Sequence, residues 1–250
     1  MSTSRLLFIA ITTLLAAALA RGAETSVLAR LSFQASMQAG ARDTNGQVMA
    51  GTEVMHLVPH QGRLYAGNSL WMEKDPDVPK ACQVLVLDAP TNQWRVDHQF
   101  TRRCLRLGSL KSVTFSGGGQ SKAAGAVTLL LAAPDVLRGP VNVFCRDDAT
   151  GQWVPSVLGV VTNYTSTRAL GFHRDRVTGR EQVFAGCDKL GVLAGVLDAT
   201  APGRLRWATA PEMLTPAGER VMGFCDCNGT FYCVPSHNTA WIYRGELPGQ

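Results

Sequence analysis

Short stretches in which apolar and polar residues alternate recur along the chain and are separated by residues that favour turns. Residues 62–67 read Gly-Arg-Leu-Tyr-Ala-Gly, and comparable stretches lie at 127–133, 181–186 and 229–234. Alternation with a period of two predicts strands, and closely spaced turn residues predict that consecutive strands pair with each other. The pattern therefore predicts an all-β chain with many short strands.

Each of these strands begins a longer unit, in which a second strand and then a polar turn follow. In the first three units the turn leads to Trp94, Trp153 or Trp207, so that tryptophan recurs at intervals of roughly 55 residues, a length typical of propeller blades with four antiparallel strands. We expect each tryptophan to pack as a wedge between neighbouring blades. The alternative is a β-sandwich whose segments are similar by chance. The predicted propeller domain, 27–250, has blades at about 52–100, 104–158, 160–213 and 218–250.

The blade motifs resemble those of known propellers. Residues 62–67 are similar to a strand of kelch-type blades, and residues 148–153 (Asp-Ala-Thr-Gly-Gln-Trp) resemble a shortened Asp-box turn of the sialidase kind. Taken together, the motifs resemble a family of secreted bacterial β-propeller proteins with no settled function. The other segments that carry this resemblance are 51–55, 64–67, 94–98 and 173–179.

The number of blades decides between two architectures. In the family the chain continues through further blades, so the resemblance implies that this chain, with about four blades, is truncated and forms an incomplete ring. The alternative is a closed four-bladed propeller in which a strand at 27–35 completes the last blade. Because an open ring exposes sheet edges, it predicts self-association, whereas a closed ring predicts a monomer.

The N-terminus has the features of a secretory signal peptide. Arg5 precedes an uncharged stretch, residues 6–20, which ends in Ala-Leu-Ala. This stretch is too short to span a bilayer comfortably, and its last residues suit signal peptidase. We predict a signal peptide over residues 1–20, with cleavage after Ala20 or, alternatively, after Ala23; a buried N-terminal helix is the other interpretation. The mature chain is expected to be secreted or periplasmic, without a membrane span.

Composition and charge exclude two classes of protein. Apolar residues make up 46% of the chain, which is enough for a core and excludes wholesale disorder. The net charge of +5 is spread along the sequence rather than concentrated in a basic run. Nucleic-acid binders usually concentrate lysine and arginine on one face, so we expect no nucleic-acid partner.

The chain has seven cysteines, and three of them, Cys225, Cys227 and Cys233, are close enough in sequence to suggest a metal cluster. The dipeptide Asn228–Gly229 between them is a strong signal for a two-residue hairpin turn. This turn predicts three cross-strand pairs: Cys227 with Thr230, Cys225 with Tyr232, and Phe224 with Cys233. Cys233 would then face away from the other two thiols, which argues against a shared metal ion. We expect small buried hydrophobic residues, with one local disulfide as the alternative.

Ligands of propellers usually bind where loops converge at one end of the central channel. The longest of these loops, residues 68–80, contains an aromatic side chain and several acids. The predicted ligand-binding residues of this and the equivalent loops are Asn68, Trp71, Glu73, Asp135, Asp188 and His237. Convergent carboxylates suit acid–base catalysis, for which the candidates are Glu73, Asp75 and Asp188, or a structural Ca²⁺ ion. No other cofactor or metal is expected.

The segment at 173–176, His-Arg-Asp-Arg, contains the triplet of a kinase catalytic loop. The glycine-rich loop and the other kinase motifs that should accompany this triplet are missing from the sequence, so the match is accidental. We interpret the segment as a turn that is made rigid by a charge pair between Arg174 and Asp175.

These observations predict an exported propeller that binds a carbohydrate or an envelope polymer, or otherwise a protein ligand, through its loops. We expect a binding protein rather than an enzyme. The alternatives are a glycoside hydrolase or lyase that uses the loop carboxylates, and a truncated product without independent function.

Overall fold

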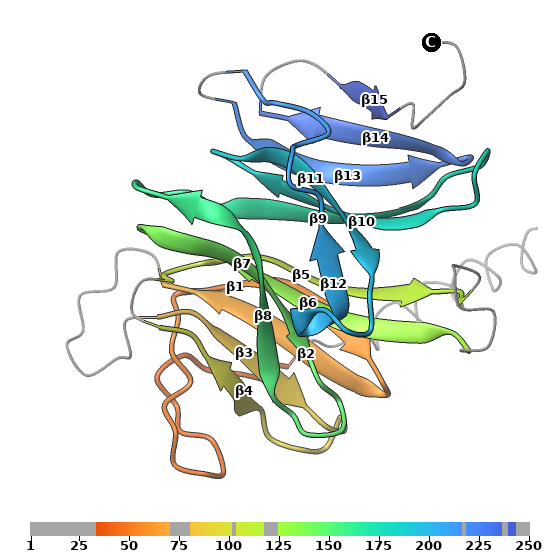
Figure 1. Ribbon diagram of the computed structural model, residues 1–250. Coiled ribbons are helices and arrows are strands. Elements are labelled where there is room, and N and C mark those ends of the chain that lie inside the picture. The colour runs from red at the N-terminus through yellow and green to blue at the C-terminus, as the bar shows by residue number, and fades with distance from the viewer. Residues whose placement is uncertain are drawn as a thin grey trace, which may run out of the picture. The chain divides into compact units, whose positions relative to one another are not determined.

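Fifteen strands in four antiparallel sheets make up the regular structure of the described residues, with one short 3-10 turn at Pro202–Arg204 (Figure 1). The structure is a computed structural model, and it describes residues 34–70, 81–101, 104–117, 125–216, 219–236 and 240–243. The predicted signal peptide lies outside these residues. Within them, no helix has the length and apolar character that a membrane crossing requires.

Each sheet is a simple meander in which every strand is hydrogen-bonded to the next strand along the chain. The first sheet contains β1 (Glu53–His60), β2 (Arg63–Ser69), β3 (Gln83–Leu87) and β4 (Arg95–Gln99). The second contains β5 (Leu107–Phe115), β6 (Val127–Pro134), β7 (Gly139–Arg146) and β8 (Trp153–Val161). The third contains β9 (Thr167–Arg174), β10 (Glu181–Cys187), β11 (Gly191–Leu197) and β12 (Leu205–Trp207), and the fourth contains β13 (Val221–Cys227), β14 (Thr230–Pro235) and β15 (Trp241–Tyr243). The chain is therefore all-β, as predicted, and none of the sheets closes on itself.

The first strands of successive sheets are neighbours: β1 lies by β5, β5 by β9, and β9 by β13 (Figure 1). Their pairing with the second strand shifts register at the same place in all four sheets, close to the beginning of the first strand. Such a shift bends the strand and increases its twist. The four sheets therefore share a local distortion in addition to their meander topology.

Apolar side chains on facing sheets form three buried clusters, one at each junction between successive sheets. Trp153 belongs to the cluster between the first and second sheets, and Trp207 packs against the cluster between the second and third. These two tryptophans pack between sheets, as expected. Trp94 does not, because it lies on the other face of the first sheet, where Met37, Ala41 and Met49 cover it. No sheet precedes the first one in the described chain, so the segment before β1 buries this face.

The β13–β14 hairpin has the register predicted from Asn228–Gly229. The pairs are Cys227 with Thr230, Cys225 with Tyr232, and Phe224 with Cys233. Both turn residues have positive φ, 50° at Asn228 and 69° at Gly229, as a type I′ turn requires.

The cysteines are free thiols, and five of them are buried. The expectation of buried hydrophobic residues is wrong for Cys225 and Cys227, which are exposed. They lie on the outer face of the fourth sheet, where Val234 and Ile242 are also exposed. No other sheet of the described chain follows to cover this face.

The turn at 174–180 is rigid for a different reason from the one predicted. Asp175 Oδ1 accepts hydrogen bonds from the backbone NH groups of Val177 and Thr178 and from the Thr178 hydroxyl. These bonds hold the pKa of Asp175 below its ordinary value, with Thr178 as the largest cause. The carboxylate that was expected to pair with Arg174 thus binds the backbone of its own turn.

Candidate ligand-binding site

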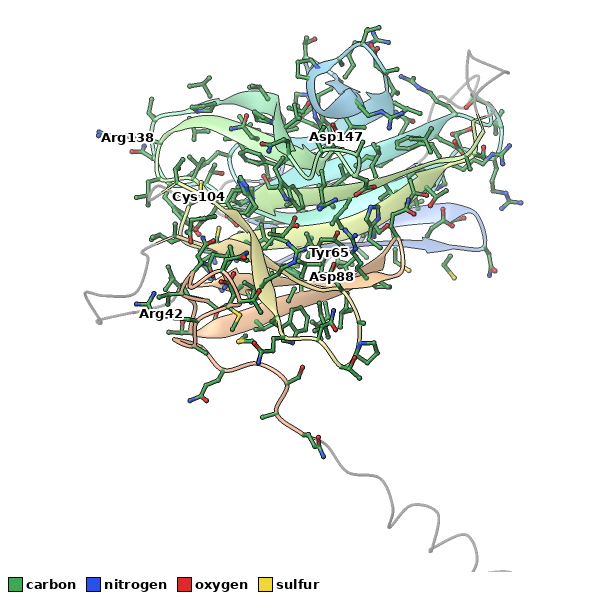
Figure 2. All side chains as sticks on the ribbon, turned by 90° about the horizontal axis from the view of Figure 1, so that it is seen from below. Arg42, Tyr65, Asp88, Cys104, Arg138 and Asp147 are labelled. Carbon is green, nitrogen blue, oxygen red and sulfur yellow. The ribbon has the colours of Figure 1, made fainter. Side chains whose placement is uncertain are left out.

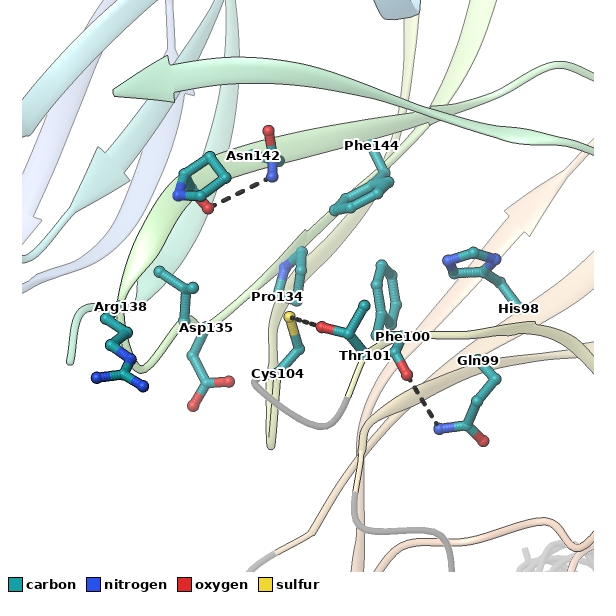
Figure 3. A pocket seen from close by; sticks show the side chains of 12 residues that line it. His98, Gln99, Phe100, Thr101, Cys104, Pro134, Asp135, Arg138, Asn142 and Phe144 are labelled. Atoms are coloured by element: carbon teal, nitrogen blue, oxygen red, sulfur yellow. Dashed lines mark hydrogen bonds between the residues drawn. The ribbon is translucent and has the colours of Figure 1, made fainter. Parts of the chain in front are cut away.

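A cavity of about 620 Å³ lies between the first and second sheets (Figure 3). Its volume falls within the range that is typical of small-molecule sites. The end of β4 and the segment after it form one side, and the end of β6, the β6–β7 connection and β7 form the other. The lining residues are His98, Gln99, Phe100, Thr101, Cys104, Pro134, Asp135, Val136, Arg138, Pro140, Asn142 and Phe144.

Three rings form an aromatic wall in this cavity. Phe100 and Phe144 meet edge to face, with centroids 5.1 Å apart, and the His98 ring lies 4.6 Å from Phe100 and 6.0 Å from Phe144. Edge-to-face contacts of this kind fix the orientation of the rings. Burial lowers the pKa of His98 below its ordinary value, so the imidazole is neutral at pH 7.

Asp135 is the most unusual polar residue of the cavity because its carboxylate is only half satisfied. The residue is 1% exposed. Its Oδ1 accepts a hydrogen bond of 2.9 Å from the backbone NH of Arg106, whereas Oδ2 is buried without a hydrogen-bond partner among the described residues. A buried acceptor without a donor costs about 1–3 kcal/mol, and more when it is charged. Asp135 therefore keeps one unused acceptor among the residues that line the cavity.

The pKa of Asp135 reflects the same environment. Burial raises it above the ordinary value, while the backbone NH of Arg106 and the Tyr164 hydroxyl, which is near the carboxylate but forms no hydrogen bond of normal geometry with it, oppose this rise. Arg138 is exposed, and it extends to the same side of the cavity as Asp135 (Figure 3). Figure 2 shows Arg138 and Cys104 at this edge of the sheets. The cavity thus offers one buried acceptor, one exposed cation and an apolar wall.

Asp135 also belongs to a row of charged residues that runs along the beginnings of the first strands. Arg106 Nη2 lies 3.6 Å from Glu53 Oε2, and Arg168 Nε lies 3.4 Å from Asp188 Oδ2. Burial raises the pKa of Asp188, and Arg168 is the main opposing group. We call Glu53, Arg106, Asp135, Arg168 and Asp188 the charged row. Successive sheets contribute to it, and Asp135 links it to the cavity.

Of the predicted ligand-binding residues that the structure describes, Asp135 alone lines the cavity. Asn68 is buried, and its amide is already used, because Nδ2 donates to the carbonyl of Ala50 and Oδ1 accepts from the backbone NH of Gln83. Asp188 is in the charged row but not among the residues that line the cavity. The other predicted residues, Trp71, Glu73, Asp75 and His237, lie outside the described residues.

Sequence reasoning missed His98, Phe100, Asn142 and Phe144. It placed the site at the loop end of a central channel, whereas the cavity opens between the faces of two successive sheets. The available signal was a pair of aromatic residues: Phe100, which follows Gln99 at the end of β4, and Phe144 within β7. That signal is weak, because such residues are most often core.

The carboxylates of the described residues do not form a metal cluster with neighbouring side chains. In that part of the chain, no group of three or more His, Cys, Asp or Glu side chains converges as a metal site would. A structural Ca²⁺ ion therefore stays a prediction from sequence.

The burial of His98 predicts a pH dependence of stability. Because its folded pKa lies below the unfolded value of about 6.5, the unfolded chain binds the proton first, and stability falls as the pH drops below that value. The variant His98→Phe keeps a ring in the aromatic wall but removes this titration. We expect a smaller loss of stability between pH 7.5 and 5.5 in urea denaturation of the variant. An equal loss in both proteins would show that His98 titrates normally.

Comparison of the chain with protein-family models, with curated proteins and with solved structures gave no match.

Proposed function

We propose that the chain is an exported, propeller-type binding protein that takes a carbohydrate or envelope polymer into the cavity between its first and second sheets. The observation that carries this proposal is Asp135, whose buried Oδ2 lacks a donor at the wall of an aromatic cavity. The propeller itself, its incomplete ring and its resemblance to secreted bacterial propellers are parts of the proposal.

Three features of the described sheets support a propeller. Each sheet is a meander, as propeller blades are. The first strands of successive sheets are neighbours, as inner strands around a central channel would be. The register shift near the beginning of each first strand gives the four sheets a common local geometry. The outer face of the fourth sheet is open, which fits an incomplete ring that self-associates.

The lining of the cavity supports a sugar as the ligand. Sugar rings present a face of C–H groups that packs on aromatic rings, and an edge of hydroxyl groups that both donate and accept hydrogen bonds. Phe144 and His98 suit the face, Asp135 accepts from a hydroxyl group, and Arg138 donates to one.

The same lining favours a binding protein over a hydrolase. A glycoside hydrolase uses two carboxyl groups about 5–9.5 Å apart. Of the described residues that line the cavity, Asp135 is the only carboxylic acid. A hydrolase at this site would need a second carboxyl group from Glu73 or Asp75, both of which lie outside the described residues.

The test is isothermal titration of the purified chain with N-acetylglucosamine oligomers and soluble glycan fragments of cell wall. We expect binding of at least one of these probes, and an affinity at least about tenfold lower in Asp135→Asn. Asparagine keeps the Oδ1 that accepts from Arg106 and replaces the unpaired oxygen with a donor, so the fold should be retained.

Asp147→Asn is the matched control, because Asp147 lies in an exposed turn away from the cavity and should leave the affinity unchanged. Failure of every probe to bind, or an equal affinity in Asp135→Asn, would contradict the proposal. Light scattering of the same samples separates a monomer, expected of a closed ring, from the self-association expected of an open one.

A further inference from the structure

Two exposed thiols, Cys225 and Cys227, lie on one strand of the fourth sheet, remote in sequence from every residue of the cavity. Their cross-strand partners are Tyr232 and Thr230, and a single residue separates them. Side chains two residues apart in a strand point to the same face of the sheet. The two thiols therefore stand side by side on the outer face of the fourth sheet.

The residue between them is held from the other face, which fixes the orientation of the strand. The Asp226 carboxylate lies 2.6 Å from His173 Nδ1 on β9. Next to it, Phe224 stacks on Phe231, with centroids 5.3 Å apart, in the cluster between the third and fourth sheets. Because Phe224 and Asp226 are both held on the inward face, the strand is already oriented so that Cys225 and Cys227 point outward.

The approach to the thiols is open. A Cβ atom added at Gly223, the preceding residue on the same face, would meet nothing within 4 Å. A metal ion can therefore reach both sulfurs from solvent, and it binds cysteine as the thiolate.

The spacing of the two residues favours a bridging ion over a disulfide. Residues on the same face of a strand have Cα atoms about 6.7 Å apart, and their Cβ atoms are at a similar distance. A disulfide needs Cβ atoms about 3.5–4.5 Å apart, so it would require the strand to leave its extended geometry and its pairing with β14. Two metal–sulfur bonds of about 2.3 Å span up to about 4.6 Å between the sulfurs, a separation that the two side chains reach by rotation.

We propose that Cys225 and Cys227 form a two-thiolate site for a soft monovalent metal ion, Cu(I). Soft thiolate ligands select Cu(I), and this ion accepts two sulfurs without a third protein ligand. Binding converts two thiols and one Cu(I) into a bis-thiolate complex of charge −1 and releases two protons, with no change in oxidation state. The site is independent of the cavity and of its ligand.

The test is an anaerobic titration of the full chain with Cu(I) in competition with a chromophoric Cu(I) chelator. We expect one equivalent of Cu(I) to be withdrawn per chain, and addition of Cu(I) should leave the molar mass measured by light scattering unchanged. Each of Cys225→Ser and Cys227→Ser should weaken binding at least about a hundredfold. Cys233→Ala, which removes a buried thiol of the same hairpin that faces inward, should leave the stoichiometry unchanged.

The pH dependence of binding adds a second readout. Because both thiols lose a proton when Cu(I) binds, the apparent affinity should rise more steeply with pH in the original chain than in Cys225→Ser, which has one thiol at the site. Equal competition by Cys225→Ser and the original chain would overturn the proposal. Two other results would also overturn it. One is a single Cu(I) bound between two chains, and the other is a disulfide between Cys225 and Cys227 in the air-exposed protein, seen as a mass lower by two hydrogen atoms.

Discussion

Replacement of Asp97 by alanine should lower the free energy of unfolding by about 3–5 kcal/mol, because the buried Arg146 guanidinium then keeps only the partly exposed Asp148 as a partner. Arg146 Nε and Nη2 donate to the two oxygens of Asp97 at 2.9 and 3.1 Å, and both side chains are about 5% exposed or less. Trp153 Nε1 donates to the same carboxylate at 2.8 Å. Chemical denaturation followed by tryptophan fluorescence measures the loss.

Two further variants show whether the buried charge is the cause. In Asp97→Ala with Arg146→Met, no buried charge is left, so the double variant should lose less stability than Asp97→Ala alone. Asp88→Ala removes a half-buried carboxylate that pairs with Arg95 at the surface of the same sheet, and it should cost less than about 1 kcal/mol. If Asp97→Ala costs no more than Asp88→Ala, the buried pair does not hold the first two sheets together.

Local geometry explains which parts of the fold could be predicted from the sequence. The Asn228–Gly229 turn needs two residues with positive φ, and that requirement alone sets the register of β13 and β14. Whether a side chain is buried is not determined by neighbouring residues in the sequence in this way. Cys225 and Cys227 were expected to be buried, but whether a face of a sheet is covered depends on a neighbouring sheet that no short pattern in the sequence encodes.

The tryptophans illustrate the same limit. Trp94 and Trp153 follow similar polar turns, yet Trp153 packs between two sheets and Trp94 packs under the segment that contains Met49. The difference arises because the first sheet has a described neighbour on one side only. A motif therefore predicts that a residue is buried more reliably than it predicts which element buries it.

Asp135 is the one described residue of the cavity that was predicted from the sequence. It comes directly after the strand predicted at 127–133, where a loop side chain is expected. His98 could not be placed by alternation. The pairing of β3 with β4 shifts register between Val84 and Leu85, so that Val84 lies opposite His98 while Leu85 lies opposite Val96. Strict alternation puts His98 on the face of Val96, whereas the shift turns it to the other face, where it contacts Phe100 and reaches the cavity.

Phe231→Ala should be the most damaging single change in the fourth sheet, with a loss of about 3–5 kcal/mol in the free energy of unfolding. Phe231 is 2% exposed. Its ring stacks on His173 and Phe224 and lies 4.7 Å from the centroid of Phe184, so it joins the fourth sheet to the third. Urea denaturation gives the size of the loss, and hydrogen exchange gives its location.

The location distinguishes a local effect from a global one. Because the outer face of the fourth sheet is open, this sheet is held mainly by its cluster with the third, and the amides of β13 and β14 should lose protection before those of β6. Val234→Ala, an exposed residue of the same strand as Phe231, should cost less than about 1 kcal/mol. Equal loss of protection in all four sheets of Phe231→Ala would mean that they unfold as one cooperative unit, and that the fourth sheet depends on more than this cluster.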